Sequence, residues 1–307
     1  MANHRILAER LLFPEGPVAC SDGSVLLVEI ERKTITRVSE DGKVAIVAQC
    51  DGGPNGAAMG PDGCLYICNN GGFLFQAIGG FNRVKPGVPE GYAGGWIERL
   101  DIKTGERRIL YTHCGEHRLV GPNDIVFDRH GGFYFTDYGK LYPRHRMNGG
   151  VYYARADGSR IVEVAYPLSM PNGVGLSPDG TTVYVAETES GRLWAFDLQE
   201  PGIAPRHSNL APHGGRLVCG LPGYQRLDSL ALDTAGNIHV ATLSTGCITV
   251  VSPAGDILEQ IMTGDPVTTN VCFGGSDRNT AYVTLSGLGQ LVAIESKYTG
   301  LDLAWEL

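Results

Sequence analysis

Residues 171–187 read PNGVGLSPDGTTVYVAE, and this stretch decides the fold. A short run with alternating apolar residues leads to the pair Asp179-Gly180, and a second run rich in β-branched and aromatic residues follows it. Asp-Gly between two such runs is a strong short-range marker of a β-hairpin. The stretch therefore predicts a strand, a tight turn and a second strand.

The same plan occurs five more times along the chain, in residues 14–30, 54–70, 122–138, 227–243 and 269–285. A weaker hairpin follows most of these segments, with turns at Asp41-Gly42, Thr104-Gly105, Asp157-Gly158 and Ala254-Gly255. Two hairpins make one four-stranded antiparallel blade, and six repeats in 307 residues leave about 51 residues for each blade. The sequence thus predicts an all-β chain that forms a single domain over residues 1–307, a six-bladed β-propeller.

The closure of the ring and a long insertion each leave two alternatives. The last blade is completed either by a strand near Arg5-Ile6-Leu7 or by a C-terminal strand at residues 301–307. The insertion, residues 71–95, is rich in glycine and carries four aromatic residues. It is either a surface loop with its own apolar cluster or a wall over one end of the channel, since long loops on rigid scaffolds often carry function.

Composition and charge exclude several classes of protein. Lys and Arg number 25 against 33 Asp and Glu, so the net charge of −8 disfavours a nucleic-acid partner, which needs a basic face. No stretch approaches the ~20 apolar residues of a membrane helix. The first residues, MANHRILAERLLF, are too charged for the core of a signal peptide. We therefore expect a cytoplasmic monomer or small homo-oligomer with reduced cysteines and no membrane contact.

The second position of each repeat carries an oxygen-bearing side chain: Glu15, Asn55, Asn123, Asn172, Asp228 and Asn270. Equivalent positions in a closed ring lie at one height around the axis, so these side chains are expected to converge. Two carboxylates with several amide oxygens suit a hard cation such as Ca²⁺ or Mg²⁺, and carboxylates also suit Mn²⁺. The ends of the following strands repeat the theme with Glu29, Asn69, Asp137, Glu187 and Thr242. The alternative is that these residues only cap turns.

Four of the six motifs carry a resemblance to a known family. With FPEGPV (Glu15), GPNDIVFD (Asn123), MPNGVGLSPDG (Asn172) and RLDSLALD (Asp228), the chain resembles the SMP-30/gluconolactonase/LRE-like family over about residues 10–295. That family lies within a wider group of calcium-dependent propellers that includes diisopropylfluorophosphatases. The resemblance implies one divalent metal held by Glu15, Asn172 and Asp228, with Asn123. Ca²⁺ is the first expectation, and Mn²⁺, Zn²⁺, Mg²⁺ and Fe²⁺ are alternatives.

The resemblance also implies an activity, that of a lactonase or related carboxylic-ester hydrolase acting on a sugar-acid lactone or another small lactone or ester. A divalent metal polarises the carbonyl as a Lewis acid, and water attacks. The chain departs from the vertebrate gluconolactonase-type members at Gly121, where they carry an arginine that contacts the sugar. The expectation of a sugar-acid substrate is weakened by this difference.

The candidate catalytic residues are Asp228, Asp124 and Glu15. A carboxylate bound to a cation is a weaker base, which favours Asp124 as the acceptor of the water proton. Alternatively, Asp124 only fixes the Asn123 loop, and Asp228 acts as base or nucleophile, as the resemblance suggests. Substrate contacts are expected from Asn55, Asn69, Asn123, Asp137 and Tyr138. Two other functions compete: hydrolysis of phosphotriester or P–F bonds at the same site, and a non-catalytic binding propeller.

Overall fold

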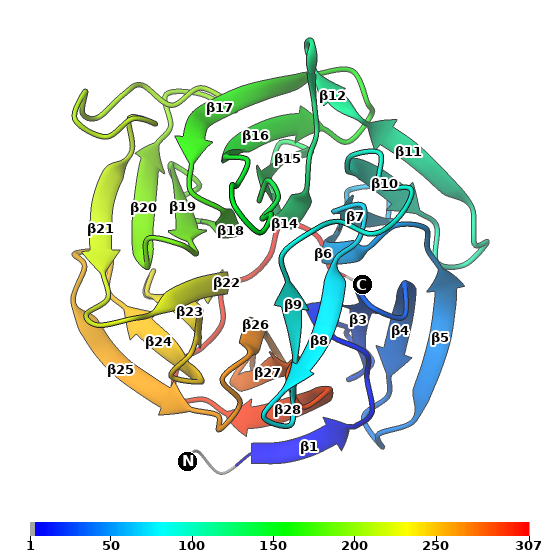
Figure 1. Cartoon of the computed structure of the whole chain (residues 1–307). Coiled ribbons are helices and arrows are strands. Elements are labelled where there is room, and N and C mark those ends of the chain that lie inside the picture. Colours follow the sequence, from blue (N-terminus) through cyan, green and yellow to red (C-terminus); the bar gives the residue numbers. More distant parts are fainter. Residues whose placement is uncertain (1–3, 307) are drawn as a thin grey trace.

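Short antiparallel hairpins repeat around a central axis in the computed structural model, which describes residues 4–306 (Figure 1). Blade 1 consists of β2 (Pro14–Ala19), β3 (Val25–Glu29), β4 (Thr34–Val38) and β5 (Val44–Gln49). Blade 2 consists of β6 (Pro54–Met59), β7 (Leu65–Asn69), β10 (Trp96–Leu100) and β11 (Arg107–Tyr111). Blade 3 consists of β14 (Pro122–Phe127), β15 (Gly132–Asp137), β16 (Gly149–Arg155) and β17 (Ile161–Leu168).

The second half of the chain supplies the other three blades. Blade 4 consists of β18 (Pro171–Leu176), β19 (Thr182–Glu187), β20 (Arg192–Asp197) and β21 (Arg216–Gly220). Blade 5 consists of β22 (Arg226–Leu232), β23 (Ile238–Leu243), β24 (Cys247–Val251) and β25 (Ile257–Met262). Blade 6 consists of β26 (Thr268–Gly274), β27 (Thr280–Leu285), β28 (Gln290–Glu295) and β1 (His4–Ala8). The six-bladed β-propeller predicted from the repeats is confirmed.

The Asp-Gly pairs that predicted the hairpin turns also stabilise them in the structure. In blades 1 and 4 the turn aspartate accepts a hydrogen bond from the backbone two residues on, at 3.0 Å from Ser24 N to Asp22 Oδ1 and 3.1 Å from Thr181 N to Asp179 Oδ1. Glycine follows each aspartate in the left-handed region that the turn requires. Blade 6 has no glycine there, and Arg278 adopts the left-handed conformation with φ 56°. The most degenerate repeat thus keeps the turn geometry without the usual residue.

The N-terminal strand closes the ring. β1 pairs antiparallel with β28, with His4 opposite Ile294 and Ile6 opposite Val292. The alternative, a closing C-terminal strand, is not formed by residues 301–306, and Leu307 lies outside the described residues, as do Met1–Asn3. Instead the tail crosses one end of the propeller (Figure 1). Leu301 N donates to Leu232 O at 2.9 Å, and Trp305 Nε1 donates to Asp128 O at 3.2 Å.

The innermost strands, β2, β6, β14, β18, β22 and β26, all begin at the same end of the axis, which we call the entry end. The insertion between β7 and β10 lies over this end and forms a hairpin of β8 (Leu74–Ile78) and β9 (Phe81–Lys85) (Figure 1). Its backbone reaches blades 6 and 3, because Asn82 N donates to Gly287 O at 2.9 Å and Gly87 N donates to Leu141 O at 2.8 Å. The structure therefore favours the wall over the self-contained surface loop.

Apolar side chains fill the space between neighbouring blades. Between blades 2 and 3, for example, the rings of Tyr66, Phe127 and Phe133 pack with centroids 5.0–5.8 Å apart. A short two-stranded ribbon, β12 (His113–Cys114) with β13 (His117–Arg118), precedes blade 3. All eight cysteines are free thiols. Within residues 4–306 there is no helix of the length and apolarity needed to cross a membrane.

Candidate functional site

The six polar residues of the repeats stand at the entry end of the innermost strands and are buried. Their exposed fractions are between 3% and 7% for Glu15, Asn55, Asn123, Asn172, Asp228 and Asn270. In every blade the pairing register shifts beside this residue, as between Glu15 and Val18 in blade 1. Such bulges re-aim side chains. Each of the six polar residues is thus accompanied by the same local irregularity of the backbone.

Contacts between neighbouring blades link several of these residues, which we call together the ring of polar residues. Asn270 Nδ2 donates to Glu15 Oε2 at 2.7 Å, which joins blade 6 to blade 1. A Cβ at Gly16 would overlap the carbonyl oxygen of Asn55, and Gly16 also has φ 50°, so only glycine suits this position. Ser229 Oγ donates to Asn172 Oδ1 at 3.3 Å between blades 5 and 4. The glycines of the PEG and PNG motifs thus allow a narrow inner ring.

Asp124 occupies the position that glycine takes in blades 1, 2 and 4. Its Oδ1 accepts from Ile125 N at 3.0 Å, and its Oδ2 accepts from Val174 N of blade 4 at 3.3 Å. Asp228 differs, because Ser229 N donates to its Oδ1 at 3.1 Å and its other hydrogen bond comes from the side chain of Asn172 in blade 4. Of the two candidate bases, Asp124 therefore has both oxygens held by backbone N–H groups, and Asp228 has only one oxygen so held.

The three buried acids influence one another. Burial raises the pKa of Glu15, and hydrogen bonds from Asn270 and Gly16 oppose this. Burial, and then the charge of Glu15, raises the pKa of Asp124 to about 7 and the pKa of Asp228 well above its usual range. Three buried carboxyl groups whose charges oppose one another's ionisation are poorly stabilised by the chain's own residues.

The donor set fits a hard cation. Asn123 Oδ1 is buried with no hydrogen-bond partner in the described chain, and an orphaned buried acceptor calls for an explanation such as an ion. With the carboxylates of Glu15 and Asp228 and the amide oxygen of Asn172, it gives four oxygen donors of the kind that Ca²⁺ prefers. No group of three or more His, Cys, Asp or Glu side chains in residues 4–306 is arranged to hold a metal by itself. Amide oxygens are thus essential to this set.

Two of the residues expected to contact the substrate instead accept hydrogen bonds from backbone N–H groups. Asp137 accepts from Val120 N at 2.6 Å, Gly121 N at 2.8 Å and Gly139 N at 2.9 Å. Asn69 Oδ1 accepts from Gly53 N at 2.9 Å and Gly71 N at 3.1 Å. Both residues thereby fix loops that lead into Asn55 and Asn123.

Tyr138 lies against the wall. Its ring meets Phe73 of the insertion edge-on, with centroids 6.3 Å apart. Lys140 Nζ donates to Gly72 O at 2.8 Å and sits 4.2 Å from the centre of the Phe73 ring. These contacts tie the insertion to blade 3 beside the ring of polar residues.

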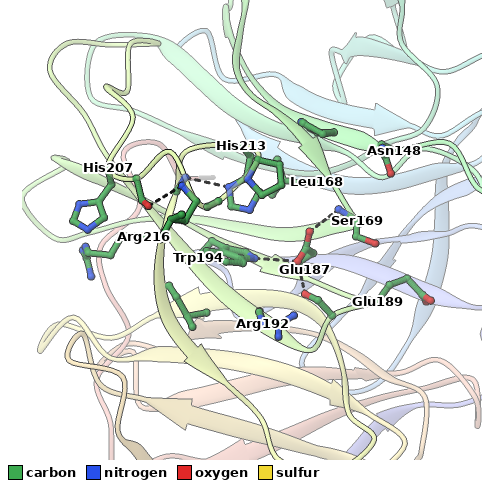
Figure 2. A pocket seen from close by; sticks show the side chains of 18 of the residues that line it. Asn148, Leu168, Ser169, Glu187, Glu189, Arg192, Trp194, His207, His213 and Arg216 are labelled. Atoms are coloured by element: carbon green, nitrogen blue, oxygen red, sulfur yellow. Dashed lines mark hydrogen bonds between the residues drawn. The ribbon is translucent and has the colours of Figure 1, made fainter.

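The sequence reasoning missed a charged cluster at the entry end. Glu189, just after β19, pairs with Arg226 at 2.5 Å and with Arg146 at 3.5 Å. The available signal was position, since Arg226 stands only two residues before Asp228 in RLDSLALD. Glu189 and Arg146 also line a hollow of about 990 Å³ between blades 3 and 4 (Figure 2).

Known proteins resemble this chain in sequence. The model for the SMP-30/Gluconolactonase/LRE-like region matches residues 13–287. A lactonase named drp35 from Staphylococcus saprophyticus is 30% identical over 250 residues, which cover 81% of this chain and 69% of the relative. A gluconolactonase from Zymomonas mobilis is 28% identical over 298 residues, which cover 88% and 75% respectively.

Solved structures share the architecture. A gluconolactonase from Xanthomonas campestris superposes with a TM-score of 0.74 at 22% identity, covering 96% of this chain and 89% of the other. The calcium-binding protein regucalcin from Agrobacterium tumefaciens gives 0.74 at 18% identity, covering 98% and 96%. At such identities the likeness supports the fold, whereas the sequence match extends over nearly the whole propeller. The chain belongs to the SMP-30/gluconolactonase/LRE-like family.

Proposed function

We propose that the protein is a metal-dependent hydrolase that opens a small lactone at the ring of polar residues. The observation that carries the proposal is the burial of Glu15, Asn123, Asn172 and Asp228 at equivalent positions of the repeats, with Asn123 Oδ1 unpartnered. Family membership supports it, because relatives in the family are named lactonase and gluconolactonase.

These four residues would hold the metal, with Ca²⁺ as the first candidate. A divalent cation bound there supplies Lewis-acid polarisation of the lactone carbonyl. The amides of Asn123 and Asn172 add oxygen donors without adding charge, so the site carries fewer buried negative charges than an all-carboxylate set. Glu15 is kept in place by the bonds from Asn270 and Gly16.

Hydrolysis adds water across the acyl C–O bond. The water oxygen bonds to the carbonyl carbon, the ring C–O bond breaks, and one proton ends on the alkoxide that leaves. We assign the transfer of that proton to Asp228, because only one of its oxygens accepts a backbone N–H group within residues 4–306. Asp124 then has a structural role, since Oδ1 accepts from Ile125 N of its own strand and Oδ2 accepts from Val174 N, which joins blade 3 to blade 4.

The substrate would lie between the ring and the wall formed by the insertion. We assign Asn55, Asn123 and Tyr138 to direct contacts with it. Asn69 and Asp137 affect substrate binding indirectly, because they hold the loops that lead to Asn55 and Asn123. The wall excludes water from the reacting carbonyl, which strengthens polar interactions there.

The test is acid release from a panel of sugar δ- and γ-lactones, alkyl lactones and an aryl ester after EDTA treatment. Ca²⁺, Mn²⁺, Zn²⁺, Mg²⁺ or Fe²⁺ is then added back separately. We expect metal-restored turnover of one lactone class and its loss in Asp228→Asn. Folded protein that hydrolyses no lactone with any metal would contradict the proposal.

A further inference from the structure

Arg226 stands at the start of β22 with much of its hydrogen-bonding capacity unused. Its Nη2 donates to Glu189 Oε1 at 2.5 Å. Its Nε is buried and has no acceptor in residues 4–306, although the side chain as a whole is 28% exposed. A guanidinium offers five N–H donors in one plane, and a buried donor without a partner is destabilising. The position thus favours a ligand that brings oxygen acceptors.

The Arg226 side chain belongs to the same end of the propeller as the ring of polar residues. Arg226 is two residues before Asp228 on the same strand, and its charge opposes the rise in pKa that burial causes at Tyr138. A group bound to Arg226 would therefore sit beside the reacting centre, with the ring of Tyr138 as its neighbour.

The surroundings favour an anion in spite of the chain's net charge of −8. Glu189 is shared between two arginines, so Arg146, Arg226 and Glu189 together carry one net positive charge. The next carboxylate, Glu187, is engaged by Ser169 N, Ser190 and Trp194 Nε1 (Figure 2). Arg192 also lines the hollow and has no ion-pair partner among the described residues.

We propose that Arg226, assisted by Arg146, binds a carboxylate of the substrate, so that the protein prefers lactones that carry an acidic group near the ring. This inference rests on the proposed function and names the substrate class of that site. A carboxylate matches the planar fork of a guanidinium with two parallel hydrogen bonds. A dianionic phosphate would meet stronger repulsion from Glu15, Asp124 and Asp228, so a monoanion fits better.

The experiment compares a γ-lactone carboxylate, 5-oxotetrahydrofuran-2-carboxylate, with its neutral carboxamide, using protein loaded with the metal that restores turnover. We expect kcat/KM to favour the carboxylate. In Arg226→Gln the value for the carboxylate should fall about 10- to 100-fold, the range of a hydrogen bond to a charged group. The value for the carboxamide should fall far less. Arg226→Lys keeps the charge without the planar fork and should recover part of the preference.

Arg99→Gln is the matched control, because Arg99 pairs with Asp62 at 2.5 Å and its side chain is 27% exposed, but it lies on blade 2 away from the ring. Calorimetric titration with 2-hydroxyglutarate, the ring-opened product, gives a readout besides turnover. Its affinity should fall in Arg226→Gln and not in Arg99→Gln.

Two outcomes would overturn the inference, and they differ. Equal kcat/KM for carboxylate and carboxamide, or equal loss of both in Arg226→Gln, removes the carboxylate preference and leaves the lactonase intact. Absence of turnover for every lactone with every metal removes the proposed function and this inference with it.

Discussion

Replacing Asp137 by asparagine tests whether this residue holds a loop in place or contacts the substrate. The carboxylate accepts three backbone N–H groups, and two of them belong to Val120 and Gly121, directly before the Pro122-Asn123 motif. Asparagine has a single acceptor oxygen. If that oxygen keeps Gly121 and Gly139, the amide NH₂ faces Val120 N and leaves a buried donor unpaired.

The magnitude follows from these bonds. An unpaired buried N–H costs about 1–3 kcal/mol, and the two remaining bonds lose their charge assistance, about 1 kcal/mol each. Burial raises the pKa of Asp137, so the neutral amide regains part of this loss. The net destabilisation is about 2 kcal/mol, or a fall of about 4 °C in the unfolding midpoint for a chain of this size.

The assay is thermal unfolding followed by steady-state kinetics on the lactone that the panel identifies. We expect the lower midpoint together with a lower kcat and weaker metal binding, because the Asn123 loop shifts, while KM changes little. Asp101→Asn is the control, since Asp101 accepts two backbone N–H groups in a surface turn. An unchanged midpoint with a raised KM would refute the reasoning and favour the substrate contact expected from the sequence.

Three further changes test other parts of the account. Burial lowers the pKa of Lys140 to about 7, so the unfolded chain binds this proton up to about pH 10.5 and the folded chain does not; stability should rise with pH between these values. Lys140→Met should therefore raise the free energy of unfolding, measured with urea, most strongly below pH 7. An increase over wild type that is the same at pH 6.5 and 9.5 would contradict this. Gly16→Ala should abolish Ca²⁺ binding or folding, seen by calorimetry and circular dichroism, because its Cβ would overlap Asn55 O. Glu15→Gln removes a charge that disfavours ionised Asp124 and Asp228, so the unfolding midpoint of the metal-free variant should equal or exceed that of the wild type. The variant should nevertheless lose the stabilisation by Ca²⁺, about 2.7 kcal/mol when Ca²⁺ is present at 100 times its Kd. Retained stabilisation by Ca²⁺ would argue against Glu15 as a ligand.

The blades could be predicted because each one depends on local chemistry. Asp179-Gly180 and its counterparts specify tight turns, and alternating apolar residues specify strands with one face in the core. Ring closure depends on which of two short segments finds β28, which no local signal decides. The hairpin of the insertion had a signal in Gly79-Gly80, where both glycines have positive φ, but its aromatic residues fitted a loop equally well.

The candidate site was predictable to the extent that the repeat register fixes it. Glu15, Asn123, Asn172 and Asp228 share one position, so symmetry alone brings them together. The direction in which Asn69 and Asp137 turn depends on loops from the preceding blade, which sequence spacing does not show. Arg226 was missed because it stands outside the second position of its repeat. Its role depends on an ion pair with Glu189 of the neighbouring blade, which sequence spacing does not show.

Titration of EDTA-treated protein with Ca²⁺, followed by both calorimetry and lactone hydrolysis, tests whether one bound metal ion is required for catalysis. We expect binding and turnover to rise together and to saturate at one ion per chain, and we expect Asp228→Asn to weaken both. Full turnover in the metal-free protein, or Ca²⁺ binding that Asp228→Asn and Glu15→Gln leave unchanged, would contradict it.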